Sequence, residues 1–193
     1  MRGFERMTGG KVALFADCLL AGVLTAVASI PLVTAYPAFA AACTVLRERV
    51  AEDRSVTVRG FARHMRSAIA SGPAGLLLPW LYAVVLGLDA VAVAAGVPGA
   101  AVLTTILLGS SAAGIVVALR SAARWRPGSQ WMRLFVAVVR DLRRDPAGSA
   151  LLVGAAAAAA AIAAIVPVTL LLVAGPAALA AIAVDGRARP QPR

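Results

Sequence analysis

Two carboxylates lie inside long apolar runs of this sequence. Asp17 is the only charged residue in segment 12–46, and Asp89 lies in the apolar run 72–99. A carboxylate in hydrocarbon is costly, so it is expected to face a helix bundle, a cavity or a partner. Ion or proton-coupled transport is one chemistry that Asp89, together with Asp17, could support. A structural hydrogen bond to another helix is the second interpretation, and both stay open at the level of sequence.

No other residues form a pattern of catalysis or metal binding. The chain lacks a phosphate-binding loop, HExxH, Gly-x-Ser-x-Gly and paired-cysteine metal motifs. Cys18 and Cys43 stand apart in apolar segments and are interpreted as packing residues. His64, the single histidine, lies among arginines and is predicted to be a solvated surface residue. We therefore predict a non-enzymatic protein that holds neither a metal nor a cofactor.

The composition indicates an all-α, polytopic membrane protein. Of 193 residues, 61% are hydrophobic and only 15% are charged, and the mean hydropathy is +0.85. These values predict a single integral membrane domain over residues 1–193. The net charge of +10 could suit nucleic acid, but all 19 Lys and Arg residues fall into four blocks between apolar runs, at 2–11, 47–66, 120–144 and 187–193. Binding of nucleic acid is not expected from this distribution.

The basic blocks predict a topology, because Lys and Arg near membrane segments favour the cytoplasm. We expect three hairpins, at about 12–46, 73–119 and 146–184, which give six crossings. Segments 47–72 and 120–145 and both termini are then cytoplasmic. The alternative has five crossings, with an external N-terminus and residues 38–46 lying along the interface.

The first hairpin requires a turn near its middle. At about 1.5 Å per residue, one helix over 12–46 would exceed a hydrocarbon core of about 30 Å. Pro31 and Pro37 interrupt the run, with Thr34 between them. The sequence therefore predicts a turn from Pro31 to Pro37.

Two cytoplasmic segments have the pattern of amphipathic helices. In segment 55–70, Phe61 shares an apolar side with Val58, Met65 and Ile69, while Arg59, Arg63 and Arg66 share the other side. In segment 131–144, Trp131 begins an apolar face, and the opposite face carries Arg133, Arg140, Arg143 and Arg144. Both segments are predicted to lie in the membrane interface with arginines on anionic headgroups, or to dock a cytoplasmic partner. The candidate contact residues are Phe61, Arg63, Arg66, Trp131, Arg133, Arg140, Arg143 and Arg144.

Segment 31–46, PLVTAYPAFAAACTVL, contains a Pro-x-x-Thr motif at Pro31 and Thr34, and Phe61 and Met65 follow in the basic segment. In these residues, and more weakly through 134–152, the chain resembles the YesL-like family of bacterial membrane proteins. The resemblance implies a multi-pass protein of the bacterial cytoplasmic membrane. It also implies an accessory role in sugar uptake, since these proteins are typically encoded beside carbohydrate ABC transporters and glycoside-degrading enzymes. It implies no catalytic residues.

The sequence thus predicts a non-enzymatic accessory or interaction subunit of the inner membrane. Its expected partners are anionic headgroups, permease subunits of a carbohydrate ABC transporter, or a second copy of itself. The alternative is a small transporter or channel that uses Asp89 and Asp17.

Overall fold

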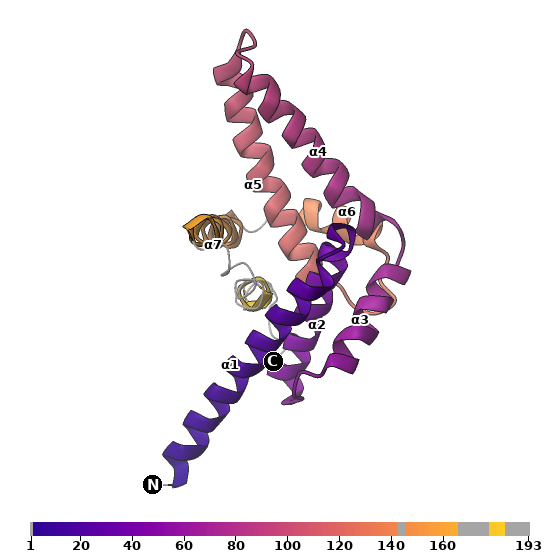
Figure 1. Cartoon of the computed structure of the whole chain (residues 1–193), viewed down its shortest axis with the longest axis vertical. Helices are drawn as coiled ribbons and strands as arrows, with labels where there is room; N and C mark the ends of the chain where they lie inside the picture. Colours follow the sequence, from indigo (N-terminus) through magenta and orange to yellow (C-terminus); the bar gives the residue numbers. More distant parts are fainter. Residues whose placement is uncertain (1, 143–145, 166–177, 184–193) are drawn as a thin grey trace.

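A computed structural model describes residues 2–142, 146–165 and 178–183, and every regular element in these ranges is a helix (Figure 1). The prediction of an all-α protein is confirmed for this part of the chain. Residues 178–183 are helical, and the other elements are α1 (Arg2–Ala28), η1 (Leu32–Thr34), α2 (Ala35–Glu52), α3 (Val58–Ala70), α4 (Ala74–Ala94), α5 (Ala100–Arg124), α6 (Trp131–Asp141) and α7 (Pro146–Ile165).

The predicted turn after the first helix is present. α1 ends at Ala28, and the Thr34 hydroxyl donates a hydrogen bond to the Ala28 carbonyl at 2.5 Å. Pro37 lies in the first turn of α2, where a backbone N–H has no intrahelical partner to lose. Helix α1 begins at Arg2, earlier than the apolar run alone predicts, so the first basic block is helical too.

Helix α2 is the centre of the protein core. Residues 40–46 are 0–4% exposed, and α1, α3 and α5 pack against this helix. Its small side chains, chiefly alanines, allow neighbouring helices to approach closely. Protein therefore covers residues 38–46, the segment that the five-crossing alternative places along the membrane interface.

Helices α4 and α5 form the predicted second hairpin. They have 21 and 25 residues, or about 32 and 38 Å at 1.5 Å per residue, enough for a core of about 30 Å. Gly96 and Gly99 in the connection have φ of 73° and 86°, a left-handed conformation that glycine adopts without steric cost. Large apolar side chains are exposed along both helices, namely Leu81, Val84, Leu88, Val91, Val102, Ile106 and Leu108. Such a surface suits hydrocarbon better than water.

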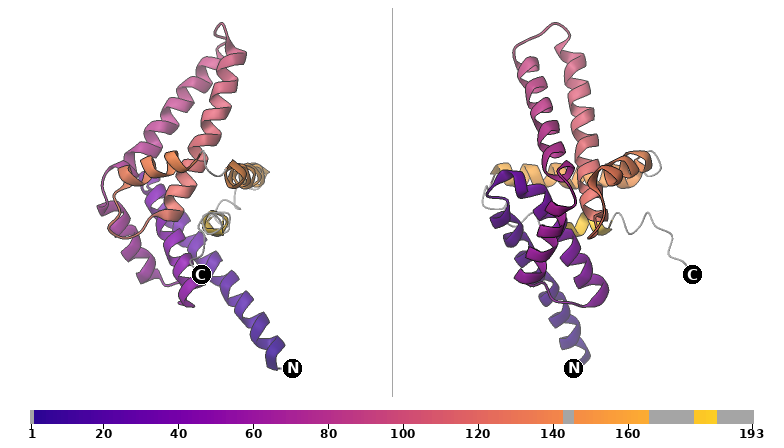
Figure 2. Two further views of the ribbon diagram at one scale, coloured as in Figure 1. Left: turned by 180° about the vertical axis from the view of Figure 1, so that it is seen from behind. Right: turned by 90° about the vertical axis from the view of Figure 1, so that its right-hand side faces the viewer.

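The first hairpin contacts the α4–α5 hairpin near the base of the latter, where α4 begins and α5 ends. The indole N–H of Trp80 donates to the Leu32 carbonyl at 3.2 Å, and the Tyr36 hydroxyl donates to the Ala118 carbonyl at 3.1 Å. Trp80 is six residues after Ala74, or about 9 Å into α4. From this junction, α4 and α5 extend one way along the long axis of the molecule and α1 extends the other way (Figures 1 and 2).

This arrangement does not confirm six crossings. Within the described residues, only α4 and α5 are long and apolar enough to cross a membrane. The apolar part of α1, Ala13–Ala28, is shorter, and the apolar residues of α2 are used in the core. Helix α7 is seen end-on in Figure 1, where α4 and α5 lie in the plane, so it runs across α5 instead of beside it. The second arm predicted after α7 lies mostly outside the described residues.

Candidate functional site

The base of the α4–α5 hairpin is held together by Trp131. This side chain is 1% exposed, and its indole N–H donates to the Ala68 carbonyl of α3 at 2.9 Å. Its ring is 5.8 Å from that of Trp125 and also contacts Phe135. On α4, a Cβ at Gly75 would lie 2.4 Å from Trp131 Nε1, so only glycine fits there without a shift. Trp131 therefore joins α3, α4 and α6.

Two predicted lipid or partner contacts are thus internal. Phe61 and Trp131 are buried, because α3 packs along α2 and α6 packs against α4 and α5. The amphipathic pattern correctly predicted two helices. Their apolar faces are, however, turned largely toward protein, and the prediction of Phe61 and Trp131 as surface contacts is wrong.

The polar sides of the same helices carry exposed arginines, which we together call the arginine surface. It consists of Arg59, Arg63 and Arg66 on α3 and Arg133 and Arg140 on α6, and all five side chains are exposed. Within the described part of the chain, none of them has an ion-pair or hydrogen-bond partner. Arg143 and Arg144, predicted to belong to the same face, lie outside the described residues.

Other arginines in the same basic blocks have structural contacts. Arg47 donates to the carbonyls of Ala123 and Trp125 at the end of α5, where carbonyls lack intrahelical donors. Arg124 forms an ion pair of 2.7 Å with Asp141 and so joins α5 to α6. Sequence alone does not separate these arginines from the exposed ones, because all belong to the same dense blocks.

Asp17 has a structural partner. Its carboxylate accepts a hydrogen bond from Arg49 Nε at 2.5 Å and one from the Val56 backbone N–H at 3.3 Å. Arg49 also binds Asp53, and hydrogen bonds to Asp53 and to Asp17 raise the pKa of Arg49. The carboxylate thereby links α1 to α2 and to the connection before α3. This geometry favours the structural interpretation of Asp17.

Asp89 lies in the distal half of α4 and is partly exposed. No described residue forms an ion pair or a hydrogen bond with it. The structure therefore does not bring the two sequence candidates, Asp17 and Asp89, into one site.

His64 is buried, at 5% exposure, and its Nε2 is 3.0 Å from Glu48 Oε1. The contact does not complete a hydrogen bond. The prediction of a solvated histidine is wrong, because α3 turns this position toward α2. Among the described residues, no group of three His, Cys, Asp or Glu side chains could hold a metal ion.

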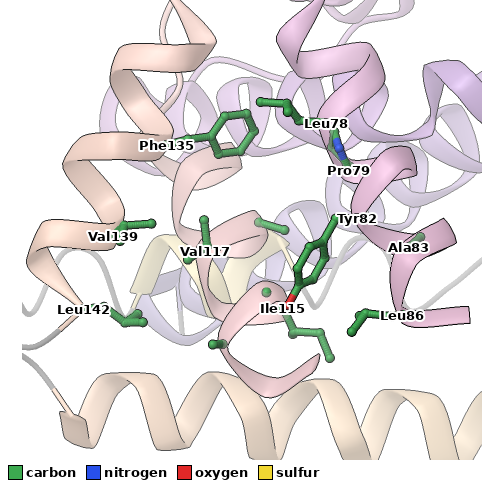
Figure 3. Close-up of a pocket in the computed structure, with 13 residues that line it drawn as sticks. Leu78, Pro79, Tyr82, Ala83, Leu86, Ile115, Val117, Phe135, Val139 and Leu142 are labelled. Carbon is green, nitrogen blue, oxygen red and sulfur yellow. The ribbon is translucent and has the colours of Figure 1, made fainter. Parts of the chain in front are cut away.

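An apolar groove of about 580 Å³ opens between α4, α5 and α6 (Figure 3). The Tyr82 hydroxyl at one wall donates to the Ser110 carbonyl of α5 at 2.6 Å. A Cβ at Gly114 would lie 2.2 Å from the Tyr82 ring, so the glycine makes room for the tyrosine. The lining residues come from three helices, namely Leu78, Pro79, Tyr82, Ala83, Leu86, Ala113, Gly114, Ile115, Val117, Ala118, Phe135, Val139 and Leu142. No sequence pattern marks this groove, because its walls are assembled by the fold.

Comparisons with family models, with curated proteins and with solved structures give no match to this chain.

Proposed function

We propose that this protein is a non-enzymatic accessory subunit of the bacterial cytoplasmic membrane. The α4–α5 hairpin is its membrane anchor, and the helices at the hairpin base display the arginine surface to a partner. The observation that carries this proposal is the position of those exposed arginines on α3 and α6, the helices that directly precede and follow the apolar hairpin; none of them has a partner among the residues that the structure describes.

The charge distribution supports a cytoplasmic base. The connection at 95–99 has no charged residue, whereas the chain on both sides of the hairpin is rich in arginine. Positively charged flanks favour the cytoplasmic side, so the 95–99 connection is external. We assign two crossings, to α4 and α5. Six crossings would also require α1, α2 and α7 to span the membrane, whereas among the described helices only α4 and α5 are long and apolar enough.

Guanidinium groups favour partners that carry carboxylates or phosphates, because their planar donors can bind two oxygens at once. The YesL-like resemblance supports a permease subunit of a carbohydrate ABC transporter as the partner.

Charge reversal on the arginine surface tests this proposal. The triple variant Arg63→Glu, Arg66→Glu, Arg133→Glu is expected to recover at least about tenfold less partner than the wild type, because several exposed charge contacts become repulsive. The measurement is a pull-down in mild detergent with mass spectrometry, at low salt to limit screening. Asp89→Asn is the control and is expected to recover the partner normally. Recovery of only a homo-oligomer by the wild type, or equal recovery by the triple variant, would contradict the proposal.

A small transporter is the second candidate, and the lack of a described partner for Asp89 favours it. In a transporter, Asp89→Asn abolishes flux in reconstituted vesicles. Against this candidate, the described groove beside α4 is lined by apolar side chains and a tyrosine, with no charged group. The accessory proposal predicts that wild type and Asp89→Asn show the same flux as protein-free vesicles.

A further inference from the structure

The groove between α4, α5 and α6 has the position and size of a site for one lipid chain. It reaches from Leu78 near the start of α4 to Leu86, a length of about 12 Å along the helix. This is close to half of a hydrocarbon core of about 30 Å. Its volume of about 580 Å³ lies within the range of roughly 300–1,000 Å³ that is usual for ligand pockets.

A cationic group lies on α6 beside this groove. A second hollow on α6 is lined by Phe135, Val136, Val139 and Arg140, so the two hollows share Phe135 and Val139. Arg140 is exposed and has no ion-pair or hydrogen-bond partner in the described part of the chain. The fold therefore places an available guanidinium beside an apolar groove.

We propose that this groove binds an anionic phospholipid of the cytoplasmic leaflet. One acyl chain lies between α4 and α5 against Tyr82 and Ala113, and the phosphate binds Arg140. The inference rests on the proposed orientation, in which the hairpin base lies at the cytoplasmic headgroups. The apolar walls of the groove favour binding of an acyl chain. The guanidinium of Arg140 favours a headgroup with a negative charge.

A phospholipid fits these features better than a second copy of the protein. A helix from another copy is about 10–12 Å wide with its side chains, whereas this groove is walled by two helices of the same hairpin and lined on another side by Phe135, Val139 and Leu142. An acyl chain is much narrower than such a helix. Association of two copies without bound lipid is one outcome that the test can detect.

Two substitutions separate the chain site from the headgroup site. Ala113→Phe fills the groove from α5, and Ala90→Phe places the same side chain on an exposed position of α4 outside the groove lining. Arg140→Gln removes the charge, and Arg59→Gln removes an exposed arginine of α3 that also has no partner in the described ranges. Each control matches its test variant in chemistry and differs in position.

The experiment uses the full chain in nanodiscs of phosphatidylcholine with a minor fraction of phosphatidylglycerol, followed by native mass spectrometry after release. We expect the wild type, Ala90→Phe and Arg59→Gln to retain one phosphatidylglycerol in preference to phosphatidylcholine. Ala113→Phe is expected to retain neither lipid. Arg140→Gln is expected to prefer phosphatidylglycerol over phosphatidylcholine about tenfold less than the wild type does, which is the effect of one charge-assisted contact.

Equal retention of the two lipids by the wild type would overturn the site, as would normal retention by either test variant or a lipid-free dimer. If the protein enters nanodiscs but retains no lipid, the proposed lipid site is wrong, and the proposed membrane anchor is unaffected. A chain that does not enter nanodiscs contradicts the anchor itself, so the two failures are distinguishable.

Discussion

Trp131→Ala is expected to lower the free energy of unfolding by about 3–5 kcal/mol, the usual cost of truncating a buried aromatic residue. The indole fills the junction of α3, α4 and α6, and its N–H is the donor to the Ala68 carbonyl. Removal of the ring leaves a cavity and an unpaired buried acceptor, so both effects act in the same direction. Unfolding by SDS titration in mixed micelles, followed by circular dichroism, measures the change.

Two further variants make this test specific. Trp131→Phe keeps an aromatic ring and loses the donor, so a smaller loss of about 1–3 kcal/mol is expected. Met132→Ala is the matched surface control, because Met132 is the next residue of α6 and is exposed; its effect should be within about 0.5 kcal/mol. A Trp131→Ala protein as stable as Met132→Ala would show that Trp131 does not hold the hairpin base.

The double variant Leu81→Arg, Val84→Arg is expected to prevent membrane insertion. These side chains are 61% and 55% exposed near the middle of α4, where a hydrocarbon environment would surround them. An arginine near the centre of a membrane helix costs about 2.5–3.5 kcal/mol, so two cost about 5–7 kcal/mol. Carbonate extraction of membranes measures the result, as a shift of the chain from the membrane pellet to the soluble or degraded fraction.

Val58→Arg is the control for this prediction. Val58 is an apolar residue of α3 with 59% exposure, and it lies outside the hairpin. The substitution is expected to leave the protein in the membrane pellet. Full membrane retention of the double variant would mean that α4 is not surrounded by lipid.

Local signals in the sequence predicted the helices and the turns. Proline at 31 and 37 acts on the backbone within a few residues, and the turn after the first helix was predicted from it. The Gly-Val-Pro-Gly connection at 96–99 is an equally local signal within the predicted second hairpin. The alternation of apolar runs and arginine blocks likewise located the α4–α5 hairpin. Both kinds of signal are local. The backbone restrictions of proline and glycine set the turns, and the hydration of short apolar or charged segments sets the hairpin.

The partners of each helix face were less predictable. Periodicity shows that α3 and α6 have an apolar side, but it does not say whether lipid or protein covers that side. Phe61 and Trp131 are buried because α2 and α4 happen to meet them in the fold. The Asp17–Arg49 pair joins residues 32 positions apart, and the apolar groove joins three helices, so neither has a signature in one segment.

Cysteine accessibility in intact cells tests the central claim most directly. Val97→Cys places a thiol in the exposed connection of the hairpin, and Gln130→Cys places one at the exposed start of α6. The native Cys18 and Cys43 are buried and should give little background labelling. A membrane-impermeant maleimide is expected to label Val97→Cys from outside, and Gln130→Cys only after the membrane is opened. Labelling of Gln130→Cys in intact cells, or protection of Val97→Cys, would contradict a hairpin that crosses the membrane with its basic base in the cytoplasm.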